Sequence, residues 1–270
     1  MGELPKERLE PIPPFTSIAM DVFGPYYIKD RRTELKRRGL LITCLYSRAI
    51  HVEILEDMSS DSIIQALRCF MALRGPVQVI HCDNGTNFVS ANNEMKKKLE
   101  TASVEMKHYL LQNRIHFKFN TPSASHQGGA AERMIRSVRA VLNSMAMKLK
   151  NRLDTKTLRT FFYEAGNINN RPLATTSTDN PEDNVITPNH ILTMKNKLLL
   201  APPPGHFSDD DLYSSRRWKA AQLAAEDFWK AWRTEYLQSI TIRQKWRNAK
   251  ENVKDGDVVL IKDENAARSD

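Results

Sequence analysis

The spacing of apolar positions changes along the chain and predicts strands and helices in alternation. Short runs rich in branched and aromatic residues are typical of strands, whereas apolar residues repeated every three or four positions are typical of helices. Three strands, a helix, a strand, a helix, a strand and a long helix indicate an α/β domain with a mixed sheet. Strands are predicted at Ser17–Phe23, Leu40–Tyr46, Ile50–Leu55, Val77–Cys82 and Ile115–Phe119. Helices are predicted at 59–74, 92–113, 130–149, 158–170 and 212–237.

These elements divide the chain into four parts. Residues 1–16 are charged and Pro-rich and are expected to form a linker, and residues 17–150 form the α/β core. Residues 151–207 make a helical and irregular extension. Residues 208–270 hold a long Trp- and Ala-rich helix, followed at 253–265 by a turn and one strand of a small, incomplete β-barrel.

The stretch between the first two predicted strands, residues 29–39, is densely charged. We expect a hairpin tip here, with Gly39 in the strained turn position. Its basic side chains suit phosphate contacts or a nuclear import signal, and a solvated loop explains them equally well. The basic residues are Lys29, Arg31, Arg32, Lys36, Arg37 and Arg38.

The composition of the chain indicates what kind of partner it binds and in which cellular compartment it is expected. The formal net charge is +8, from 40 Lys and Arg against 32 Asp and Glu, which favours a polyanionic partner such as DNA. The three cysteines show no C-x-x-C pairing, so we expect reduced thiols in an intracellular protein. No apolar run approaches the roughly 20 residues of a membrane span. The charged, Pro-rich N-terminus is not a signal peptide.

Three acids stand at positions where function explains them well. Asp21 interrupts an apolar strand, where an unpaired charge is costly. Asp83 follows a buried strand and opens a turn, the usual place for a functional group in an α/β sheet. Glu132 lies in the first turn of the long helix. Each acid alone is also compatible with a solvated or capping role, and only their convergence would make a site.

The long helix places Glu132 on a polar stripe. At about 100° per residue, Glu132 shares one face with Arg136, Arg139 and Asn143, which predicts one metal ligand followed by contacts to a phosphate backbone. Pairing of Glu132 with Arg136 on a solvated face is the alternative. The opposite, apolar face is expected to bury Met134, Ile135, Val138, Val141, Leu142, Met145 and Leu149.

Three converging carboxylates form an oxygen-rich site suited to Mg²⁺ or Mn²⁺. Two such ions about 4 Å apart serve phosphodiester chemistry, because one activates the attacking oxygen and the other stabilises the leaving oxygen. Two divalent ions are therefore the expected cofactor.

The sequence around these acids resembles the DDE integrases of retroviruses and LTR retrotransposons, and is most similar to the BEL/Pao group. This resemblance implies an RNase H-like core with a five-stranded mixed sheet flanked by helices, and it makes residues 208–270 similar to the C-terminal region of Pao polyproteins. The motifs that carry it are MDVFGP at 20–25, LYSRAIHVE at 45–53, HCDNGTNF at 81–88, TPSASHQGGAAERMIRSVRAVL at 121–142, INNRPLATTSTDNPEDNVITPNHIL at 168–192, RRWKAAQLAAEDFWKAWRTEYL at 216–237 and GDVVLIKDEN at 256–265.

The resemblance implies roles for individual residues. Asp21, Asp83 and Glu132 match the catalytic, metal-binding triad. The turn that shapes the site matches Asn84, Gly85 and Asn87. Residues near the scissile DNA match Ser125, His126 and Gln127, which with Arg136, Arg139 and Asn143 are the expected DNA-binding set.

The implied activity is DNA integration: metal-dependent processing of DNA 3′ ends, then strand transfer into target DNA. DNA ends and target DNA are the expected partners, with self-association and a nuclear location. Two features depart from the family pattern, because a preceding zinc-binding module is missing and the C-terminal barrel is cut off. A polyprotein fragment, a decayed copy or a derived gene fits this pattern. The alternatives are a domesticated remnant that binds DNA or a protein without catalysis, and a nuclease or DDE transposase on the same fold.

Overall fold

The computed structural model describes residues 12–82, 89–90, 93, 115–119, 129–150, 152–170, 187–194, 208–212 and 216–240, without the side chains of 129–135, 137 and 235–240. The predictions for 83–88, 92–113, 120–128 and 253–265 therefore lie outside the described residues, apart from the helical backbone at residue 93.

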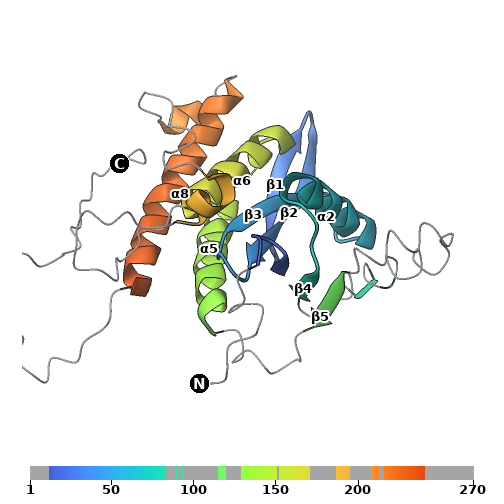
Figure 1. The fold of residues 1–270 in the computed structure, drawn as a ribbon. Coiled ribbons are helices and arrows are strands. Elements are labelled where there is room, and N and C mark those ends of the chain that lie inside the picture. Colours follow the sequence, from blue (N-terminus) through green and yellow to red (C-terminus); the bar gives the residue numbers. More distant parts are fainter. Residues whose placement is uncertain are drawn as a thin grey trace, which may run out of the picture.

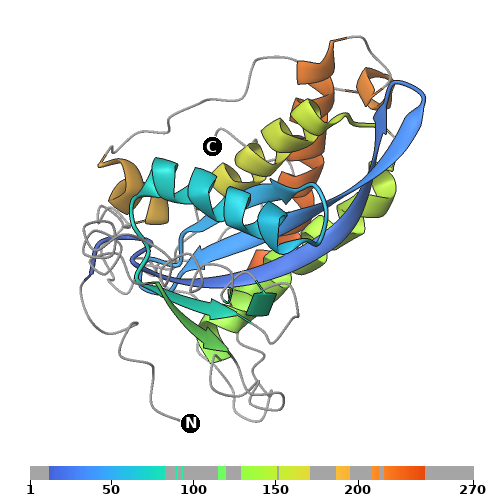
Figure 2. The same cartoon turned by 90° about the vertical axis from the view of Figure 1, so that its right-hand side faces the viewer.

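A five-stranded mixed sheet forms the centre of the molecule, with the strand order β3-β2-β1-β4-β5 (Figures 1 and 2). Strand β2 pairs antiparallel with both β1 and β3, whereas β4 runs parallel to both β1 and β5. Strand β1 is consequently the middle strand. The strands are β1 Ser17–Asp30, β2 Thr33–Cys44, β3 Ile50–Leu55, β4 Val79–Cys82 and β5 His116–Phe119.

Helices cover both faces of this sheet, and their ends follow from local sequence. Ser59 caps helix α2 by accepting a hydrogen bond from the Ser62 amide, and Gly75 ends it with a φ of 92°, a conformation that favours glycine. Asp154 caps α6 by accepting from the Thr157 amide at 2.8 Å. The helical elements are α2 Ser60–Arg74, α5 Gly129–Lys148, α6 Thr155–Asn169, α7 Pro188–Thr193, the short 3₁₀ helix η1 Asp209–Leu212 and α8 Arg217–Ile240.

Two hydrophobic cores lie on opposite sides of the sheet. Helix α2 covers one face, where Phe15 and Phe70 meet edge to face with ring centroids 5.2 Å apart. Helices α5, α6 and α8 cover the other face, where Phe161 of α6 packs against Phe228 of α8. Figures 1 and 2 show the sheet between these two layers. A sheet buried on both faces explains why the apolar runs of the central strands were continuous in the sequence.

The expected five-stranded mixed sheet flanked by helices is confirmed, and one local expectation is wrong. The expected hairpin forms, but β1 and β2 continue through residues 29–39 to a two-residue turn at Arg31-Arg32. Gly39 lies inside β2 rather than in a turn. A Cβ atom there would come within 2.1–2.8 Å of the Phe23 ring, so glycine is required by close packing.

Among the helices that the structure describes, none is long and apolar enough to cross a membrane.

Candidate functional site

Asp21 lies at the middle of the sheet, on the side covered by helix α5. It pairs with Leu41 of β2 in register, and its carboxylate accepts a hydrogen bond from the Arg139 guanidinium at 2.6 Å. The side chains of Asp21 and Arg139 are 28% and 46% exposed, so this ion pair can be reached from solvent. The carboxylate of Asp21, which interrupts the apolar strand sequence, is therefore paired with the Arg139 guanidinium.

Helix α5 is fixed along β1 by contacts beyond that ion pair. Asn143 accepts a hydrogen bond from the Gly24 amide at 3.0 Å, next to the register irregularity between Phe23 and Tyr26. The Tyr26 hydroxyl donates to the Leu142 carbonyl. Burial raises the pKa of Tyr26 well above its ordinary value, so the phenol keeps the proton it donates. These contacts hold the polar stripe of α5 against the strand that carries Asp21.

The predicted faces of α5 are confirmed where the side chains are described. Arg136 is exposed, and Arg139 and Asn143 point to β1. On the apolar face Val138, Val141, Leu142, Met145 and Leu149 are buried. Met134 and Ile135 lie outside the described side chains. The assignment of Arg139 and Asn143 to DNA contacts stays a prediction, because in this structure both side chains bind β1.

Strand β4 ends directly before the second predicted acid. Ala19 of β1 pairs with His81 of β4, and the last residue of β4 is Cys82. Asp83 follows in the sequence but lies outside the described residues, as do Asn84, Gly85 and Asn87, and also Ser125, His126 and Gln127. The backbone of Glu132 belongs to α5, whereas its side chain is outside the described set.

Metal binding can be tested at only one of the three predicted ligands. Within the described part of the chain, no three His, Cys, Asp or Glu side chains gather to hold an ion, and the side chains of Asp83 and Glu132 are not part of that set. The Asp21 carboxylate nevertheless binds a cation, the Arg139 guanidinium, and carboxylate oxygens are the ligands that Mg²⁺ prefers. The donor type at Asp21 suits a hard divalent cation, and in this structure the carboxylate is occupied by the Arg139 guanidinium.

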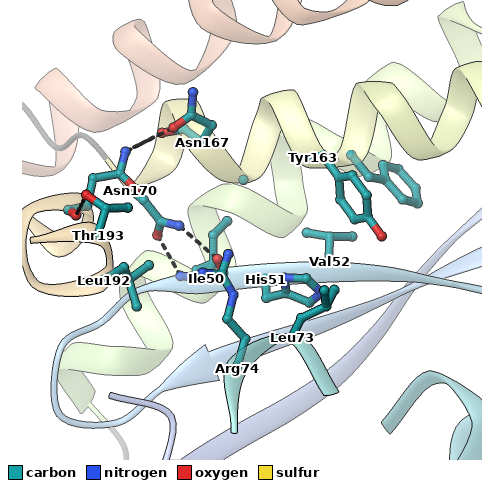
Figure 3. Close-up of a pocket in the computed structure, with 13 residues that line it drawn as sticks. Ile50, His51, Val52, Leu73, Arg74, Tyr163, Asn167, Asn170, Leu192 and Thr193 are labelled. Atoms are coloured by element: carbon teal, nitrogen blue, oxygen red, sulfur yellow. Dashed lines mark hydrogen bonds between the residues drawn. The ribbon is translucent and has the colours of Figure 1, made fainter. Parts of the chain in front are cut away.

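A separate pocket of about 410 Å³ lies at the β3 edge of the sheet, between α2, α6 and α7 (Figure 3). Asn170 closes one end by donating to the Ile50 carbonyl at 2.9 Å and accepting from the Ile50 amide at 2.7 Å. Figure 3 shows Arg74 extending from the end of α2 toward these groups. Burial lowers the pKa of Arg74 and raises that of Tyr163. None of the predicted site residues lines this pocket, although Ile50–Val52 belong to the motif at 45–53, and Asn170 and Leu192 to the motif at 168–192.

Two family models match separate segments of the chain. The integrase core domain model matches residues 14–125, and a family of unknown function, DUF5641, matches residues 216–270. No match was found among curated proteins. Residues 14–125 are thus similar to an integrase core domain, and the five-stranded mixed sheet flanked by helices is the arrangement expected from the sequence.

Similar solved structures include a simian T-cell lymphotropic virus intasome in complex with the PP2A regulatory subunit B56 gamma, at 16% identity and a TM-score of 0.43. That match covers 76% of this chain and 63% of the other. The HTLV-2 integrase catalytic core domain with magnesium matches in a trimeric form, at 18% identity and a TM-score of 0.38, over 67% of this chain and 98% of that one. Its dimeric form matches at 19% identity and a TM-score of 0.37, over 62% and 94%. Likeness at this level does not itself indicate an activity or a ligand.

Proposed function

We propose that this chain is the catalytic domain of a retrotransposon-type integrase, a polynucleotidyl transferase that processes DNA 3′ ends with water and joins them to target DNA. One observation carries the proposal most directly. An acid in the middle strand of an integrase-type sheet, Asp21, lies against the helix that also contains Glu132, next to a strand that ends one residue before Asp83.

The strand register supports a meeting of the first two acids. Ala19 and His81 are partners in parallel strands, and each is followed two positions later by an acid, Asp21 and Asp83. Consecutive Cα atoms are about 3.8 Å apart, so Asp83 cannot be far from Cys82 at the end of β4. Because β1 continues to Asp30 while β4 ends at Cys82, Asp83 is expected beside the part of β1 that holds Asp21.

Helix geometry supports the third acid. Glu132 precedes Arg139 by seven residues, which is two turns or about 10 Å along the axis, and so lies on the same face. Side chains in a helix lean toward its N-terminus, so Arg139 reaches Asp21 over the turn that precedes it. The Glu132 position therefore belongs to the helix face that meets Asp21.

In this proposal each group has a defined task. Asp21, Asp83 and Glu132 hold two Mg²⁺ or Mn²⁺ ions, which when bound supply an activated attacking oxygen and a stabilised leaving oxygen. Arg139 neutralises the charge of Asp21 and, with Arg136, faces DNA phosphates. The remaining assignments are that Asn84, Gly85 and Asn87 shape the turn, and that Ser125, His126, Gln127 and Asn143 contact DNA.

Membership of the BEL/Pao group, self-association and a nuclear location are parts of the same proposal. The group assignment is supported by the resemblance of the motifs at 45–53 and 168–192 and of the C-terminal motifs at 216–237 and 256–265. The basic excess of the chain supports DNA as the partner.

A strand-transfer assay on oligonucleotides with Mg²⁺ tests the function. Asp21→Asn and Asp83→Asn are expected to lower joining by at least about 100-fold, since losing a metal ligand costs several kcal/mol of transition-state stabilisation. Asp210→Asn, at an exposed acid of η1, is the matched control and should leave the rate unchanged. Joining that survives Asp83→Asn contradicts the proposal. A wild-type chain that binds DNA but neither nicks nor joins it would support the non-catalytic remnant instead.

A further inference from the structure

The hairpin of β1 and β2 projects beyond the rest of the sheet as a two-stranded arm, which we define as residues 26–37 (Figures 1 and 2). Strand β3 pairs with β2 only over Arg38–Thr43, and β4 pairs with β1 only over Ser17–Ala19. Tyr26 to Asp30 therefore pair only with Arg37 to Thr33. The sequence suggested a charged tip here, and the structure shows an ordered arm.

One face of the arm is anchored to the protein. Tyr26 and Ile28 are buried, and the Tyr26 ring lies 5.1 Å from that of Phe162 in α6. The Lys29 amide donates to the Leu153 carbonyl at 3.1 Å, and the Lys150 ammonium lies 5.3 Å from the Tyr27 ring. An anchored arm presents its charges without the ordering cost that a flexible loop pays on binding.

The other parts of the arm carry exposed positive charge. Residues 29–38 contain six basic and two acidic side chains. Lys29, Arg31, Arg32 and Lys36 are exposed, and none of the four forms a salt bridge with any residue that the structure describes. Arg37 differs, because it donates to the Glu56 carbonyl at 3.0 Å and helps hold β2 in place. With respect to the described residues, four cations on a rigid projection are therefore available to an anion.

The turn itself gives an independent reason to assign a function. Arg31 has a φ of 54°, a left-handed conformation that side chains other than Asn, Asp and Gly adopt at a cost. Of the two turn residues only Arg31 has a positive φ, a pattern that favours glycine at the first position, yet both positions here are arginine. Local stability does not explain this choice, whereas a task for the two guanidinium groups does.

We infer that the arm binds the phosphate backbone of duplex DNA, at a distance from the reacting end. The inference rests on the proposed function for its ligand. Nine residues separate Asp21 from Asp30, which corresponds to about 30 Å of strand. Duplex DNA rises about 3.4 Å per base pair, so a duplex that lies along the arm from Asp21 meets the turn about nine base pairs away. Backbone contacts of this kind are independent of base sequence.

A variant with a better turn and fewer charges tests the arm. In Arg31→Gly/Arg32→Asn the turn takes a favoured sequence, with glycine at the position of positive φ, so the melting temperature should stay equal or rise. Binding of a fluorescent duplex of arbitrary sequence should weaken, and the slope of log K against log salt should become shallower by about 2, roughly 0.9 for each lost phosphate contact. Arg68→Gln/Lys156→Gln, at exposed cations of α2 and α6, removes equal charge elsewhere and should leave the slope unchanged. An unchanged slope in the turn variant, or an equal loss in the control, overturns the inference.

A crosslinking experiment tests the distance. Arg31→Cys bearing a photoreactive group, in a Cys69→Ser background because Cys69 is exposed, should crosslink about nine base pairs from the joined DNA end. Crosslinks confined to the joined end would overturn the inference. The salt titration requires no catalysis, so a chain that fails to join DNA would refute the proposed function and leave the arm's binding measurable.

Discussion

The two faces of the central sheet are built from different parts of the chain. On the α2 face, every fully buried member of the core lies between Phe15 and Cys82. The core of the opposite face includes residues from Phe23 to Trp232, which come from β1, β2, β3, α5, α6, η1 and α8. The core of the α2 face is therefore built from residues close together in the sequence. The core of the opposite face also requires residues of α8, the last helix.

Asp21 and Arg139 lie on the sheet face whose core also includes residues of α8. Helix α5, which holds Arg139, contacts α8 as well as β1. The helix α8 falls in the segment that matches the family of unknown function, yet it packs into the same core as the integrase-type sheet. The geometry of the candidate site therefore depends on residues far outside the matched integrase domain.

The largest effect is expected in α8. Trp232 is 2% exposed and stacks on Phe228, so Trp232→Ala should lower the free energy of unfolding by about 3–5 kcal/mol, measured by urea denaturation. Trp218→Ala, at a half-exposed position of the same helix, should change it by less than about 0.5 kcal/mol. If α8 unfolded in a separate transition at lower urea concentration, in the wild type or in a variant, the two faces would not unfold as one unit and the comparison would be wrong.

A smaller loss of stability is expected where Gly39 of β2 packs against Phe23 of β1. Gly39→Ala brings a Cβ into the Phe23 ring and should destabilise the fold by about 1–3 kcal/mol. Combining it with Phe23→Leu should recover part of that loss, which a double-mutant cycle measures. Gly166→Ala in α6, where no atom lies within 4 Å of the new Cβ, should be neutral or stabilising. Equal losses at both glycines would show that the Phe23 contact is not the cause.

Arg139→Gln should separate stability from function. The ion pair with Asp21 is partly exposed at both ends, so thermal or urea unfolding should change by less than about 1 kcal/mol. Strand transfer should fall nonetheless, because Arg139 is proposed to face DNA phosphates beside the metal site. A loss of activity matched by an equal loss of folded protein would assign Arg139 a purely structural role.

The smallest effect is a pH dependence on the α2 face. Hydrogen bonds from the Ser59 hydroxyl and amide hold the pKa of Asp57 below its ordinary value, just before α2 begins. A carboxyl whose pKa is lowered by folding stabilises the protein above its unfolded pKa of about 3.9, and this contribution is lost as the pH falls through the folded value. The melting temperature of Asp57→Ala should therefore be slightly below that of the wild type at neutral pH and converge with it in acid. A gap that persists at low pH would exclude this cause.

Sequence patterns predicted most of the sheet and the long helices because burial sets their period. The arm was misjudged because its apolar positions, Tyr26, Ile28 and Leu35, alternate with charged ones, and the charges dominated the interpretation. Alternation of that kind is the signal of a half-buried hairpin and was present in the sequence.

The ion pair of Asp21 with Arg139 could not have been predicted in this way. The two residues are 118 positions apart, and their contact depends on how α5 lies along β1. Helical period placed Arg139 on the correct stripe but gave no distance to the strand. The roles of Asp83 and Glu132 stay predictions for the same reason, since both depend on side-chain positions in space.

The docking of α8 also limits how genes of this kind can be rearranged. Phe161 of α6 packs against Phe228 of α8, and α5 also contacts α8. A recombination event that exchanged everything after residue 207 for an unrelated sequence would leave aromatic rings facing water. The two matched segments are therefore expected to be inherited together and to accumulate compensating changes across their shared interface.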